Sequence, residues 1–106
     1  TPFTRILRAY GEAALLYPVR ASEDRVDYGD PFDIKIIASP SRAEEIILEP
    51  GYVINDYITV YAFAPLRVHD KIRRKGEDYE VLSVQPYDFR GETAYFRAVC
   101  RRMLGQ

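Results

Sequence analysis

The chain has 106 residues, the size of one compact domain with no room for a second hydrophobic core. Hydrophobic residues make up 47% of it and charged residues 29%, which excludes disordered, collagen-like and low-complexity chains. Lys and Arg total 15 against 16 Asp and Glu, a formal net charge of -1, so no global positive field holds nucleic acid nonspecifically. The longest apolar stretches fall far short of the ~20 residues of a membrane-spanning helix, and we expect no membrane partner.

Residues 1–11 favour a short amphipathic helix. Thr1 and Pro2 suit the first positions of a helix, and the apolar residues that follow repeat at helical spacing. Gly11 is a favourable end because glycine adopts a left-handed conformation at little cost. The segment is too short to be stable alone, so we expect it to dock on the domain or on a neighbouring chain.

After Gly11, short runs rich in Val, Ile, Tyr and Thr alternate with turn residues, which is typical of β structure. The expected strands are residues 14–19, 33–39, 45–48, 57–63, 70–75, 78–85 and 93–102. Gly76 and Gly91 mark two hairpins, and residues 20–31 are expected to form a surface loop. The sequence therefore predicts a mainly β fold, a small antiparallel β-barrel with a short N-terminal helix and a long inter-strand loop, as a single domain over residues 1–106.

The strand at residues 57–63 carries apolar surface on both faces. One face holds Ile58, Val60 and Ala62, and the other holds Tyr57, Thr59, Tyr61 and Phe63. In a chain this small, such a strand lies in a closed barrel or against a partner subunit. Tyrosines on the less apolar faces favour a subunit contact, and the basic cluster that includes Arg97 and Arg101 suits salt bridges between copies or contacts with DNA equally well. The interface candidates are Tyr57, Tyr61, Phe63, Tyr95, Arg97 and Arg101.

No motif for chemistry stands out. The six glycines stand singly, without the patterns that cradle phosphate groups. His69 and Cys100 are the single histidine and the single cysteine, and neither lies in a metal-ligand spacing. No combination of nucleophile, base and orienting group that would form a catalytic site is evident. We therefore expect no cofactor, no metal, no catalytic residue and no enzyme activity.

Three stretches in the second half follow one another in a recognisable order. They are Gly51-x-Val53-Ile54-x-Asp56-Tyr57-Ile58-x-Val60, Ala64-Pro65-Leu66-x-Val68-x-Asp70-Lys71-Ile72 and Gly76-x-x-Tyr79-x-Val81-x-x-Val84. This order resembles the head closure, or stopper, family of head-tail joining proteins in the necks of tailed phages and prophages. The chain departs from the family at His69, where a glycine is common.

The resemblance implies a β-barrel subunit of a homo-oligomeric ring, usually dodecameric, in the virion neck at the head-tail interface. Such a ring lies below the portal or head-tail adaptor protein and above the tail terminator or tail tube protein. It helps to retain packaged double-stranded DNA, lets that DNA pass through its channel, and offers a docking surface to the tail. Before assembly the subunit is expected in the host cytoplasm.

Some members of this family line or plug the channel with a long inter-strand loop. By order of elements, residues 39–54 are the candidate channel loop in this chain. Its candidate residues are Ser41, Arg42, Glu44, Glu45, Ile46 and Ile47.

Other readings of the sequence remain open. The first is a stand-alone SH3-like or OB-like barrel that binds a peptide or single-stranded nucleic acid, although such barrels usually pair aromatic residues with a basic groove. A second reading is a neighbouring neck component, a tail terminator or a head-tail adaptor. A small hydrolase is a more distant third.

Overall fold

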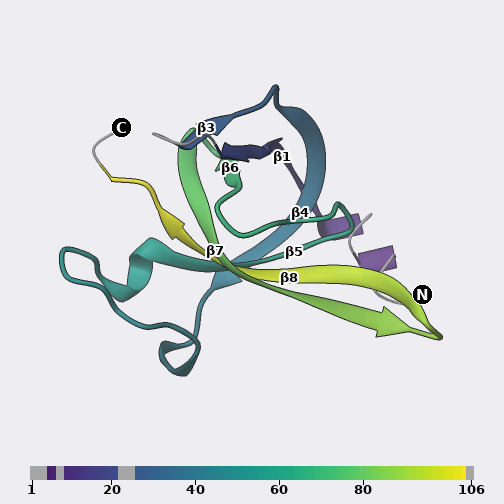
Figure 1. Ribbon diagram of the computed structural model, residues 1–106. Helices are drawn as coiled ribbons and strands as arrows, with labels where there is room; N and C mark the ends of the chain where they lie inside the picture. The colour runs from purple at the N-terminus through teal and green to yellow at the C-terminus, as the bar shows by residue number, and fades with distance from the viewer. Residues whose placement is uncertain (1–4, 7–8, 22–25, 105–106) are drawn as a thin grey trace.

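The computed structural model of the protein describes residues 5–6, 9–21 and 26–104 (Figure 1). Its elements are β1 (Glu12–Tyr17), β2 (Val19–Ala21), β3 (Val26–Tyr28), β4 (Phe32–Pro40), the 3-10 turns η1 (Ala43–Glu45) and η2 (Ile54–Asp56), β5 (Tyr57–Ala62), β6 (Lys71–Arg74), β7 (Glu77–Phe89) and β8 (Glu92–Arg102). The helix expected over residues 1–11 falls largely outside the described residues and stays a prediction.

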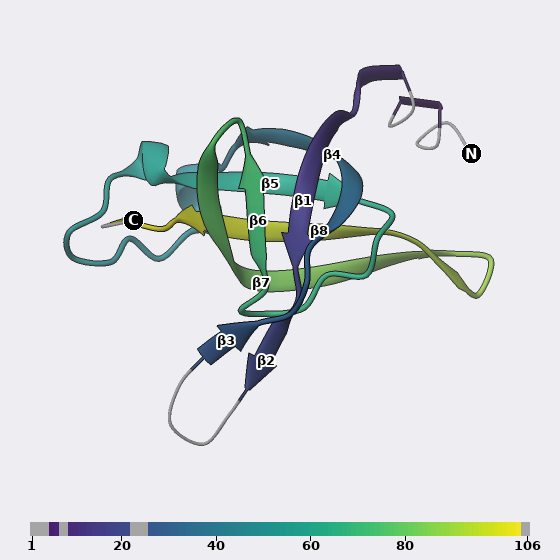
Figure 2. The same ribbon diagram turned by 90° about the horizontal axis from the view of Figure 1, so that it is seen from above.

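Six strands form a closed barrel in the order β1-β4-β5-β8-β7-β6, with β6 paired back to β1. All of these pairings are antiparallel. The remaining two strands, β2 and β3, form a separate hairpin that projects from the barrel (Figure 2). The structure thus confirms the expected mainly β fold and its antiparallel barrel.

Alternate side chains of the strands fill the barrel. In β5 these are Ile58, Val60 and Ala62, each at most 8% exposed, and β8 adds Ala98 and Cys100. The division of faces expected for the strand at residues 57–63 is therefore confirmed. Burial in this apolar interior raises the pKa of the Cys100 thiol well above its usual range, because it disfavours the charged thiolate.

Two tight hairpins shape the C-terminal half, at the glycines that the sequence marks. Lys75 and Gly76 join β6 to β7 with φ angles of 49° and 78°, and Arg90 and Gly91 join β7 to β8 with φ angles of 54° and 82°. Positive φ at both central residues gives the turn a twist that matches its strands. β8 pairs with β5 only as far as Phe96, so residues 86–95 of β7 and β8 pair with each other alone. We call residues 86–95 the arm, and Figures 1 and 2 show it projecting from the barrel.

Two segments differ from the expectation. Residues 45–48 do not form a strand: η1 ends at Glu45, and the apolar run that follows lacks the alternation that buries one face of a strand. Its member Ile47 is 89% exposed. Within residues 20–31, expected as a loop, β2 pairs with β3 from Val19 opposite Tyr28 to Ala21 opposite Val26. Short paired strands of this kind lack the long apolar run by which a strand is recognised.

A buried carboxylate joins the start of β6 to two other parts of the chain. Asp70 is 2% exposed, and its two oxygens accept backbone N–H groups of Val19 and Arg67, each at 2.9 Å. Its own carbonyl accepts the N–H of Val81 at 2.9 Å. The preceding residue, His69, has a φ of 77° and donates its N–H to the Val81 carbonyl at 2.8 Å. Position 69 thus needs the left-handed conformation that glycine adopts freely and histidine tolerates.

We expect Asp70→Ala to destabilise the barrel strongly. The change leaves the partly buried N–H groups of Val19 and Arg67 without their acceptor, at up to about 1–3 kcal/mol each. Urea denaturation followed by circular dichroism measures the loss. Asp30→Ala is the control, since Asp30 is exposed. Equal stability of the two variants would contradict the role given to Asp70.

We expect the Cys100 thiol to be unreactive in the folded protein. The residue is 0% exposed, so a thiol reagent reaches it only when the barrel opens. Modification by a chromogenic disulfide at mildly alkaline pH should be slow in buffer and immediate in denaturant. Fast modification of the native protein would show that the barrel opens readily around β8.

Candidate functional site

The outer face of β5, β8 and β7 is covered by the chain itself. Tyr57 and Thr59 point away from the barrel interior, yet they are only 1% and 3% exposed. The connection between β4 and β5, residues 41–56, lies over this face, and we call it the loop. The two apolar faces of β5 are therefore explained by the barrel interior on one side and the loop on the other.

Tyr57 ties the loop to the barrel through its hydroxyl. The hydroxyl donates to the carbonyl of Ile47 at 3.4 Å and accepts the N–H of Glu49 at 3.2 Å. A Tyr hydroxyl is one donor and also an acceptor, so one side chain holds two backbone groups of the loop. The ring of Tyr52 packs edge-on against that of Tyr57, with 6.4 Å between ring centroids.

Two ion pairs hold the loop on either side of Tyr57. Arg97 of β8 pairs with Glu45, and Arg101 of β8 pairs with Glu49. Glu45 also accepts the hydroxyl of Thr59 at 3.3 Å. A hydrogen bond to the Tyr61 hydroxyl is the main cause that raises the pKa of Arg97, and the charge of Glu45 adds to it.

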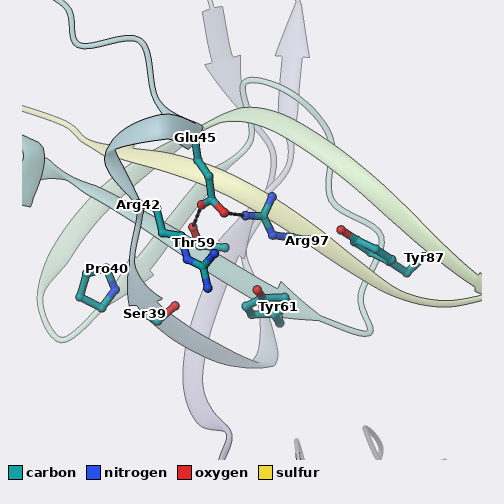
Figure 3. A pocket seen from close by; sticks show the side chains of 8 residues that line it. All are labelled: Ser39, Pro40, Arg42, Glu45, Thr59, Tyr61, Tyr87 and Arg97. Atoms are coloured by element: carbon teal, nitrogen blue, oxygen red, sulfur yellow. Dashed lines mark hydrogen bonds and ion pairs between the residues drawn. The ribbon is translucent and has the colours of Figure 1, made fainter.

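A pocket of about 480 Å³ opens beside the pair of Glu45 and Arg97 (Figure 3). Its lining consists of Ser39, Pro40, Arg42, Glu45, Thr59, Tyr61, Tyr87 and Arg97. We call it the Tyr/Arg pocket. Tyr95 stacks on Tyr87 with ring centroids 4.9 Å apart and lies 6.3 Å from the ring of Tyr61. Tyrosine and arginine are the residue types that dominate the binding energy of protein interfaces.

The loop presents large apolar side chains to solvent. We call these four the loop rim: Ile47, Leu48, Val53 and Ile54, which are 89%, 52%, 60% and 47% exposed. The loop thus makes its hydrogen bonds and ion pairs to the barrel through polar groups and exposes most of its large apolar side chains to solvent. Exposed apolar side chains gathered on one segment are typical of a contact surface.

A second, smaller groove lies under the loop. It has a volume of about 340 Å³, and β7 and β8 contribute Leu82, Ser83 and Val99 to it. The loop contributes Ile46 and Ile47, with Glu45 and Glu49 beside them. We call it the apolar groove, since aliphatic side chains from both the loop and the barrel line it.

The structure brings together residues that the sequence placed in two separate sets. Arg42 and Glu45, expected in a channel loop, line the same pocket as Tyr61 and Arg97, expected at a subunit interface. Of the other loop candidates, Glu44 and Ile47 are exposed, Ile46 is partly buried, and Ser41 is buried with its hydroxyl 2.9 Å from that of Thr59. Among the interface candidates, Phe63 is 39% exposed at the end of β5.

Tyr57 is a correction to the expected interface. Its side chain is 1% exposed and hydrogen-bonds the loop of its own chain, so it has no surface to offer another subunit. Arg101 holds the loop as well, through Glu49. Tyr87 and Glu49 are not among the residues predicted from the sequence. Tyr87 lies in β7 beyond the expected strand end at residue 85, whereas no pattern marks Glu49.

Comparisons with protein-family models, with curated proteins and with solved structures find no match to this chain. In the part of the chain that the structure describes, no group of three or more His, Cys, Asp or Glu side chains is placed to hold a metal ion. No helix among the described residues is both long enough and apolar enough to cross a membrane.

We expect Tyr57→Phe to loosen the loop while the barrel stays folded. The change removes one hydroxyl that serves both Ile47 and Glu49, at about 1 kcal/mol. Hydrogen exchange at the Glu49 amide should become at least about fivefold faster, as that loss predicts. Core amides such as Val60 should keep their protection.

The matched control for Tyr57→Phe is Tyr87→Phe. The Tyr87 hydroxyl donates to Gln85 in the same strand at 3.3 Å and makes no contact with the loop backbone among the described residues. Unchanged exchange at Glu49 in Tyr57→Phe, or equal changes in both variants, would contradict the anchoring role of Tyr57.

Proposed function

We propose that the chain is a structural subunit of a head-tail connector ring in a tailed phage or prophage. Copies of it form a ring below the portal or head-tail adaptor, help to retain packaged DNA and offer a docking surface to the tail. The observation that carries the proposal is the position of exposed apolar side chains on opposite sides of one closed barrel. The loop rim lies on one side, and Phe89, 54% exposed, lies at the arm tip on the other (Figure 2).

Contacts on two sides suit a ring subunit. In a cyclic ring each copy uses one patch toward the copy before it and a different patch toward the copy after it. A closed barrel suits this arrangement because its strand edges are paired and the barrel holds its projections rigidly. The loop, the arm and the β2–β3 hairpin are such projections. The sequence resemblance to the head closure family supports the same assignment.

The charge of the loop supports a place beside a DNA channel. Within residues 41–56 there is one arginine, Arg42, against four carboxylates, Glu44, Glu45, Glu49 and Asp56. Glu45 and Glu49 pair with Arg97 and Arg101 of β8, so this surface carries no net positive charge that would bind phosphates and slow the passage of DNA. A net charge of -1 for the whole chain agrees with that behaviour.

The Tyr/Arg pocket favours one alternative, a stand-alone module that binds single-stranded nucleic acid. Tyr61 and Tyr87 offer ring surface for bases, and Arg42 and Arg97 offer charge for phosphates. A gel shift with single-stranded DNA that weakens as salt is raised would support this alternative. A stand-alone module of this kind could also bind a peptide instead of nucleic acid.

The proposal predicts that the purified chain joins DNA-filled heads made without it. After co-sedimentation, electron microscopy should show a ring added at the portal vertex, and the packaged DNA should become resistant to nuclease. Ile47→Asp should bind more weakly, because it places a charge on the loop rim. Val68→Asp is the matched control, since Val68 is 42% exposed but lies between β5 and β6.

Two results would contradict the proposal. One is heads that stay nuclease-sensitive and show no added ring. The other is equal binding of wild type, Ile47→Asp and Val68→Asp, which would remove the loop rim from the contact. A clear shift of single-stranded DNA together with the first result would point to the stand-alone module.

A further inference from the structure

We propose that the arm tip of one copy inserts into the apolar groove of the next copy. The partner is a second copy of this chain, and the inserted group is the side chain of Phe89 with Arg90 above it. This contact rests on the proposed ring and names the two surfaces that join its subunits.

The arm tip presents an aromatic ring covered by a cation. Phe89 is 54% exposed, and the guanidinium of Arg90 lies 5.2 Å from the centroid of its ring. Arg90 and Gly91 form a two-residue turn with φ angles of 54° and 82°, which leaves little freedom at the tip. Behind the turn, Thr93 donates to Asp88 at 3.0 Å across the two strands. The tip therefore has a defined turn that presents one large aromatic side chain, the kind of group that contributes most at an interface.

The apolar groove complements this tip in size and in charge. Its volume of about 340 Å³ accommodates a phenyl ring between the aliphatic side chains of the loop and of β7 and β8. Glu45 and Glu49 lie beside it and already pair with Arg97 and Arg101, but the Glu49 side chain is still 51% exposed and can share its carboxylate with a second cation. A ring entering the groove would bring the Arg90 guanidinium close to these carboxylates. Opposite charges facing each other at the edge of an apolar contact give it orientation and specificity.

The tip and the groove lie too far apart to meet within one copy. Figures 1 and 2 show the arm leaving the barrel on the side opposite the loop, and the groove lies under the loop. The arm of each copy therefore meets the groove of another copy. Such a contact is heterologous: it leaves one tip and one groove free in any pair, and it repeats until a ring closes.

Two variants separate the two halves of the contact. Phe89→Ser removes the anchor and keeps the groove. Ser83→Arg fills the groove and keeps the arm, at a position that is exposed in the single chain. Val26→Ser is the matched control, because Val26 is a 60% exposed apolar residue on the other hairpin. Circular dichroism confirms that all three variants are folded.

Sedimentation velocity at up to about 1 mM, the weak end of specific contacts, measures self-association. Wild type and Val26→Ser should associate as concentration rises. Phe89→Ser and Ser83→Arg should each associate about 10- to 100-fold more weakly, as expected for losing a buried Phe side chain. An equimolar mixture of Phe89→Ser and Ser83→Arg should form a heterodimer and nothing larger, because only one tip and one groove remain intact.

Several results would overturn the inference. They are a wild type that stays monomeric throughout, a Phe89→Ser variant that associates like wild type, a Val26→Ser variant that is weakened as much as Phe89→Ser, and a mixture that does not pair. The head-binding assay separates this inference from the proposed function. If Phe89→Ser joins heads like wild type, the inference fails and the connector role stands. If wild type does not join heads, the connector role fails, and the mixing experiment alone decides whether copies meet through tip and groove.

Discussion

The closure of the barrel depends on one buried carboxylate. Asp70 lies at the start of β6, the strand that pairs back to β1, and its oxygens accept N–H groups from Val19 after β1 and from Arg67 before β6. A carboxylate that accepts several backbone donors compensates the cost of burying both itself and those donors. The left-handed conformation of His69 is part of the same turn. Polar groups thus tie the turn before the closing strand to the rest of the chain, although apolar burial supplies most of the stability of the barrel.

Polar side chains also position the surfaces that we assign to function. Glu45, Glu49 and Tyr57 hold the loop by its polar side, which leaves the loop rim facing water. A loop held by its apolar side would bury those residues in the same chain and leave nothing to offer a partner. Under the proposed ring, the cost of exposing them in an isolated copy would be offset when a second surface covers them.

The arm and the loop make the two sides of each subunit different. One side of the barrel carries a projecting aromatic tip, and the opposite side carries a groove with carboxylates beside it. Two different surfaces on opposite sides lead to repeated head-to-tail contacts, whereas a single self-complementary surface leads to a pair. We propose a structural role in a connector ring, and the contact between tip and groove is our proposal for how the copies in that ring join.

Alternation along the sequence by itself determined the mainly β fold, the faces of β5 and the two glycine hairpins, because these depend on residues close together in the chain. It also showed that β5 is apolar on both faces. Only the tertiary structure decided what covers the outer face. Tyr57 has the composition of an interface residue, but it is buried by the chain's own loop. That loop has no periodicity, and its path is decided by pairs far apart in sequence, such as Glu45 with Arg97 and Glu49 with Arg101. Such pairs cannot be predicted from local sequence patterns, since each depends on how the barrel brings its strands together.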